Sequence, residues 1–126
     1  MLVLVKEVGK GVYKQQIDGS LESLQNLVQG GIELVPRGEK LRNMNIAILC
    51  NEEGRLIGLD ENLIILGRDG RELTSIVGNI VYVGLDAQGD FIGLTEEQVA
   101  LINNEIFDNP VKGVRIDGLV LDSLML

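Results

Sequence analysis

The spacing of apolar residues changes along the first third of the chain, and each change predicts a new element. Residues 2–8 and 12–17 are β-rich runs joined by Gly9-Lys10-Gly11, which predicts a β-hairpin. After Ser20, a good helix N-cap, apolar residues recur on one helical face until a glycine follows as a C-terminal cap. The pattern therefore predicts a helix over residues 21–29.

Short apolar runs separated by turns follow in the middle of the chain. The polar stretch 37–45 predicts a loop, and residues 51–54 predict a turn that returns the chain through residues 55–57. The apolar run 63–66 fits a strand or a helix, because so short a run has no clear period. Strands are predicted over residues 32–35, 46–50, 73–77 and 80–83.

A second helix has the clearest local signal in the sequence. Thr95 and Gln98 form a T-x-x-Q capping box, and Leu94 and Val99 occupy the two positions of a hydrophobic staple. Asn109-Pro110 is expected to end this helix. Its predicted buried stripe consists of Val99, Ile102 and Ile106.

The order of elements predicts an α+β fold, with an antiparallel or mixed β-sheet and two short helices packed on one face. Residues 1–109 are expected to form a single domain, and residues 110–126 a C-terminal extension. The extension is apolar to its end, so it either adds a strand to the sheet, which we favour, or contacts another copy of the chain through residues 111–126.

Composition narrows the possible chemistry. The 126 residues include no histidine and one cysteine, which excludes Ser-His-Asp and Cys-His catalysis, His-based zinc sites and a disulfide framework. Cys50 lies in an apolar run and is expected to be a core thiol. No phosphate-binding glycine motif, signal peptide or membrane-spanning segment is present. We therefore expect a soluble cytoplasmic protein that is not an enzyme, without a metal or cofactor.

Charge is distributed unevenly. The net charge is −8; residues 1–45 have six Lys and Arg against five Asp and Glu, and residues 46–126 have five against fourteen. Such an acidic protein is not expected to bind nucleic acid directly. No membrane association is expected either, because no apolar segment is long enough to span a bilayer. The carboxylate pairs Glu52-Glu53 and Asp60-Glu61 are expected to be solvated turn residues.

Basic side chains in loops are the candidate ligand-binding residues. Guanidinium groups on loops suit recognition of phosphate or carboxylate. The candidates are Arg37, Lys40, Arg42, Arg68 and Arg71.

Four segments together resemble a known family. They are residues 17–35, 50–59, 78–84 and 89–98, which in this order resemble the phage- and plasmid-encoded domain of unknown function family 3846. The resemblance covers about residues 12–107. It implies a small accessory protein of a phage or mobile element, and the family offers no established catalytic residues.

These observations together favour a non-enzymatic, counter-defence protein that sequesters a small anionic nucleotide signal. The alternative is an acidic protein-interaction module or DNA mimic that binds a host protein, because the charge of residues 46–126 can imitate a row of phosphates. A lesser alternative is a hydrolase that uses carboxylates alone.

Overall fold

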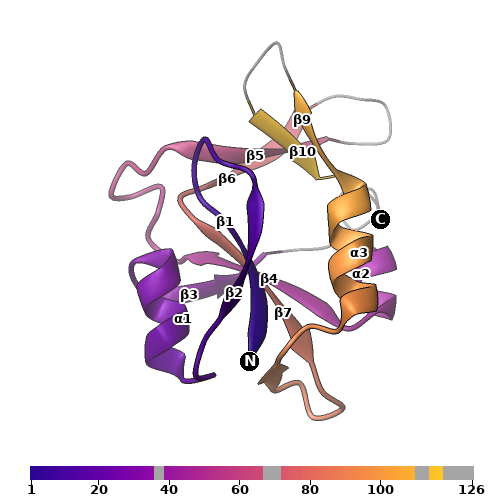
Figure 1. The fold of residues 1–126 in the computed structure, drawn as a ribbon. Coiled ribbons are helices and arrows are strands. Elements are labelled where there is room, and N and C mark those ends of the chain that lie inside the picture. The colour runs from indigo at the N-terminus through magenta and orange to yellow at the C-terminus, as the bar shows by residue number, and fades with distance from the viewer. Residues whose placement is uncertain (36–38, 67–71, 110–113, 118–126) are drawn as a thin grey trace.

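Two β-sheets and three helices make up the structure, a computed structural model that describes residues 1–35, 39–66, 72–109 and 114–117 (Figure 1). The fold is α+β and mostly antiparallel, as the sequence predicts. The apolar run 63–66, whose sequence fits a strand or a helix, belongs to a strand.

The larger sheet, sheet A, has six strands in the order β2-β1-β7-β4-β3, with β8 paired to β7, and all its pairs are antiparallel. Its three inner strands are apolar on both faces, which explains their nearly continuous apolar sequences. The strands are β1 (Leu2–Lys6), β2 (Val12–Gln16), β3 (Ile32–Leu34), β4 (Ile46–Asn51), β7 (Ile80–Leu85) and β8 (Phe91–Ile92).

The smaller sheet, sheet B, has the order β6-β5-β10-β9, in which β10 runs parallel to β5 and the other pairs are antiparallel. Its strands are β5 (Glu61–Leu66), β6 (Glu72–Val77), β9 (Ile106–Asn109) and β10 (Val114–Asp117). The C-terminal segment therefore contributes β10 to a sheet, and residues 110–113 and 118–126 lie outside the described residues.

The helices are α1 (Leu21–Val28), α2 (Glu39–Asn43) and α3 (Glu96–Glu105), and they cover both faces of sheet A (Figure 1). One core joins α1 to the face that includes Val3, Ala47 and Val81. The opposite core joins α2, α3 and sheet B to the face that includes Leu4, Ile48 and Tyr82. This arrangement differs from the predicted packing of two helices on one face, because the inner strands are apolar on both sides and each side needs a cover.

The helix starts follow the sequence closely, but α1 ends at Val28, and the left-handed residue that caps its end is Gln29, with a φ of 64°, rather than the glycine expected there. Ser20 Oγ accepts a hydrogen bond from the Ser23 amide at 3.1 Å at the start of α1. At the start of α3, the Thr95 amide donates to Gln98 Oε1 at 2.8 Å, and the Gln98 amide donates to Thr95 Oγ1 at 3.2 Å. The predicted capping box is thus confirmed, but α3 ends at Glu105 rather than near Asn109, because the next residues pair with β10.

Two further segments differ from the prediction. The expected loop over 37–45 contains α2, whose Leu41 is fully buried in the core with Val99 and Ile102 of α3. Residues 55–57 form turns rather than a returning strand. None of the described helices reaches the length and hydrophobicity of a bilayer-spanning segment.

Candidate functional site

A cleft of about 340 Å³ opens where four segments that are distant in the sequence meet. The β1–β2 hairpin contributes Glu7, Val8 and Lys10, and the end of α1 contributes Gln29. Leu59 and Asp60 form another wall, and the turn of Gly78 and Asn79 completes the lining. The volume lies near the lower end of the range of small-ligand sites.

Charges of both signs line this cleft. Lys10 Nζ lies 3.5 Å from Glu7 Oε2, and both side chains are partly exposed. Such exposed ion pairs contribute little to stability, so this pair can rearrange for a ligand at small cost. Asp60 is exposed and adds a second carboxylate, which leaves the cleft with two negative groups and one positive group.

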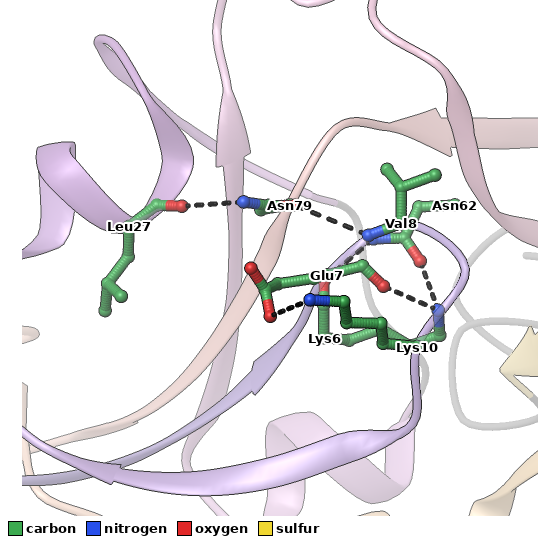
Figure 2. A network of polar contacts seen from close by, with 7 residues as sticks. All are labelled: Lys6, Glu7, Val8, Lys10, Leu27, Asn62 and Asn79. Atoms are coloured by element: carbon green, nitrogen blue, oxygen red, sulfur yellow. Dashed lines mark hydrogen bonds and ion pairs between the residues drawn. The ribbon is translucent and has the colours of Figure 1, made fainter.

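A buried polar network underlies the hairpin wall (Figure 2). Lys6 is only 2% exposed, and its ammonium donates to Asn62 Oδ1 at 2.5 Å and to the Glu7 carbonyl at 3.2 Å. Asn62 Nδ2 donates in return to the carbonyls of Lys6 and Gly78 at 2.8 and 2.7 Å. These bonds satisfy groups that would otherwise be costly to bury, and they hold the hairpin against the 78–79 turn.

Asn79 connects the cleft to α1. Its Nδ2 donates to the Leu27 carbonyl at 3.3 Å, and its Oδ1 accepts from the Val8 amide at 3.4 Å (Figure 2). Gly78 beside it has a φ of +77°, and a Cβ there would lie 2.7 Å from Leu59 Cδ1. Glycine at this position therefore permits both the turn and the close approach of Leu59.

The C-terminal end of α1 also faces this region. Asn51 is buried, and its Nδ2 donates to the carbonyls of Val28 and Gln29, each at 3.1 Å. The last turn of α1 contains no basic residue. A helix C-terminus has a partial negative charge that a cation normally complements, so this end adds negative potential beside the cleft.

Next to the cleft, residues 52–60 form an acidic loop that is well ordered by its own hydrogen bonds. The Glu53 amide donates to Asn51 Oδ1 at 2.8 Å, the Ile57 amide to the Glu53 carbonyl at 3.0 Å and the Leu59 amide to the Gly54 carbonyl at 2.9 Å. Arg55 Nη2 donates to the Ser75 carbonyl on β6. The loop is therefore fixed to both sheets.

Two large apolar side chains project from this acidic loop into solvent. Leu56 is 86% exposed and Ile57 is 56% exposed. Exposed carboxylates lie near them in the sequence, on the loop itself and at the start of β5; they are Glu52, Glu53, Asp60 and Glu61. An apolar centre with a polar, solvent-accessible rim is the usual composition of a protein-binding surface.

Cys50 is buried at the end of β4, as the sequence predicts for a core thiol. Burial, followed by the negative charge of Glu33, raises the pKa of its thiol to about 11, while Arg55 acts in the opposite direction. The reactive thiolate is therefore scarce near neutral pH.

The basic side chains singled out in the sequence do not line the cleft where the structure describes them. Arg42 is exposed on α2, and Lys40 belongs to the same helix. Arg37, Arg68 and Arg71 lie outside the described residues. That these five residues bind one anionic ligand stays a prediction.

Sequence reasoning missed the cleft because its walls come from segments far apart in the chain. Two features of the sequence point to the cleft. One is the Gly78-Asn79 turn, and the other is the presence of asparagines at the ends of strands, where they interrupt apolar runs. Within the described ranges, no group of three or more carboxylate or thiol side chains is placed to hold a metal ion.

Comparison with known proteins identifies the family of the chain. No curated protein and no solved structure matches it. The family model described as Domain of unknown function (DUF3846) matches residues 1–107, which include the cleft and the acidic loop. The chain therefore belongs to the DUF3846 family.

Proposed function

We propose that this protein is a non-enzymatic interaction module that binds a basic surface of a partner protein through its acidic loop. The observation that carries the proposal is the exposure of Leu56 and Ile57 on a loop fixed by hydrogen bonds. Large apolar side chains on such a loop lose little conformational entropy when a partner covers them.

The charges around these two residues define the partner. Glu52, Glu53 and Asp60 are exposed on the same loop, so a partner that covers Leu56 would bring its own surface close to several carboxylates. Basic residues at its rim would steer the encounter and fix its orientation. A second copy docked through the same loop would instead bring like charges together, which is unfavourable.

The biological setting forms part of the same proposal. The family resemblance supports an origin in a phage or mobile element, and a small protein of that kind can act in the host cytoplasm by blocking a host defence protein. A carboxylate-rich loop also suits imitation of DNA phosphates, because a DNA-binding host protein presents the required basic surface.

A capture experiment tests the interaction. The wild-type chain and the Leu56→Ser/Ile57→Ser variant are used as baits in an extract of host bacteria, and bound proteins are identified by mass spectrometry. We expect a protein with a basic surface to bind the wild type and to be lost with the variant. Leu21→Ser is the matched control, since Leu21 is 60% exposed on α1, away from the acidic loop. Equal capture by all three chains contradicts the proposal.

Capture of an anionic nucleotide signal is a second proposal, supported by the exposed Arg42 on a helix that also contains Lys40. Its binding residues would be Arg37, Lys40, Arg42, Arg68 and Arg71. Calorimetry with a panel of cyclic nucleotides tests it, with the Arg42→Ala variant as the comparison. Absence of heat with every nucleotide rejects this second function.

A further inference from the structure

We infer that the cleft lined by Glu7 and Asp60 binds the cationic end of a lysine or arginine side chain. This inference rests on the proposed function, because the side chain would come from the basic surface of the partner protein. The cleft and the acidic loop share Leu59 and Asp60, so one partner can contact both.

The sign of the charge in the cleft selects the ligand. The carboxylates of Glu7 and Asp60 outnumber the ammonium of Lys10, which already lies within ion-pair distance of Glu7. An anionic ligand would have to compete with Glu7 for Lys10 and would face Asp60 as well. A cation has to share Glu7 with Lys10, but it also gains the second carboxylate, that of Asp60.

The C-terminal end of α1, next to the cleft, also favours a positively charged ligand. Gln29 lies in the lining and is the C-cap of α1, whose last turn contains no basic residue. The last turn itself therefore lacks the basic side chain that often accompanies a helix end, and the amide groups of Asn51 and Asn79 bond its carbonyls instead. A bound ammonium or guanidinium would supply that positive charge from outside the chain.

The remaining lining suits the stem of such a side chain. Val8 and Leu59 give the cleft apolar walls beside its carboxylates. Lysine and arginine combine an apolar stem with a charged end, so they match this composition better than a small inorganic cation does. Asn79 is already hydrogen-bonded on both sides of its amide and acts as a support for the wall.

The experiment uses the full chain labelled with ¹⁵N and small probes of known structure. N-acetyl-lysine methylamide is titrated against N-acetyl-norleucine methylamide, which has a similar stem without the ammonium, and against inorganic phosphate. We expect the lysine probe to shift the amide signals of Val8, Gln29 and Asn79 in a saturable manner. The norleucine probe and phosphate should not do so.

Charge variants give a test of sign. Asp60→Asn should weaken binding of the lysine probe about threefold, and Lys10→Gln should strengthen it by a similar factor, in line with partly exposed ion pairs. Glu22→Gln, an exposed carboxylate on α1 that does not line the cleft, is the control and should change nothing. Equal shifts with the norleucine probe, or the opposite response of these variants, would overturn the inference.

The two proposals can fail separately. Leu56→Ser/Ile57→Ser should leave the lysine probe bound, because neither side chain lines the cleft. If the probe does not bind but capture still depends on Leu56 and Ile57, the cleft inference is wrong and the interaction proposal stands. If the probe binds and capture shows no dependence on the loop, the interaction proposal is wrong and the cleft remains a cation site.

Discussion

Amide side chains connect parts of the molecule that are far apart in sequence. Asn51 joins the end of α1 to the acidic loop, and Asn62 joins β5 to the hairpin and to the Gly78 carbonyl. Gln98 Nε2 donates to the Met44 carbonyl at 2.7 Å, which ties α3 to the segment before β4. Each of these residues is buried. These amide side chains hold the segments in position, because each donates hydrogen bonds to backbone carbonyls of another segment.

Replacing Asn62 tests this role directly. Asn62→Ala removes an acceptor from the buried Lys6 ammonium and leaves two carbonyls short of a donor, so we expect a loss of about 3 kcal/mol in the free energy of unfolding. Urea denaturation followed by circular dichroism measures it. Asn62→Asp keeps an acceptor for Lys6 but cannot donate to the two carbonyls, so it should also be destabilised, though by less than Asn62→Ala because the buried ammonium keeps a partner. Equal losses in the two variants would show that the two donated bonds, rather than the contact with Lys6, account for the effect.

The pKa of the Asp18 carboxyl should be unusually low. Hydrogen bonds from the Ser23 hydroxyl, then from the Ser20 amide and the Ser20 hydroxyl, lower the pKa of its carboxyl to about 2. A lowered pKa contributes stability that is present above the ordinary value and is lost as pH falls toward 2. NMR titration of the side-chain carbon should therefore show a higher pKa in Ser23→Ala. An unchanged pKa in this variant would refute the assignment of the first cause.

At the scale of elements, the two residues that cap α3 make different sets of hydrogen bonds. Thr95→Ala removes one capping bond, so we expect a loss of about 1 kcal/mol. Gln98→Ala removes the reciprocal bond and also the contacts with the Met44 and Asn45 carbonyls, so its loss should be larger. Thermal unfolding compares the two variants. A smaller effect for Gln98→Ala would contradict the tying role of its amide.

Elements with strong local signals were predictable, and those held by distant contacts were not. The hairpin, α1 and the cap of α3 follow from residues within one turn of each other. The five-residue helix α2 depends on burying Leu41 against other segments, and its sequence gives no comparable cap. The end of α3 likewise depends on the pairing of β9 with β10.

For the whole molecule, the sequence predicts the class of fold but not which side each helix covers. That choice depends on sheet A having two apolar faces, which appears only when β1, β4 and β7 are placed side by side. The cleft could not be predicted for the same reason, because Lys10, Gln29 and Asp60 are far apart in the sequence and come together only in the folded chain. The carboxylates indicated turns at the two ends of the acidic loop, whereas the turns over residues 55–57 and the exposure of Leu56 could not be predicted.

Self-association through the C-terminal residues can be tested without disturbing sheet B. A chain that ends after Asp117 keeps β10, which pairs with β5, and lacks the apolar stretch 118–126. If residues 111–126 hold copies together through this stretch, light scattering should give a smaller mass for the shortened chain than for the full chain. Equal masses would contradict self-association through residues 118–126.

The central position of β7 has a consequence for synthesis on the ribosome. β7 pairs with β1 on one side and β4 on the other, although these strands leave the ribosome long before it. Until residues 80–85 are made, the nascent chain presents two unpaired strand edges with apolar side chains. The growing polypeptide should therefore expose these edges until β7 has left the ribosome, a stage at which unpaired strands favour aggregation.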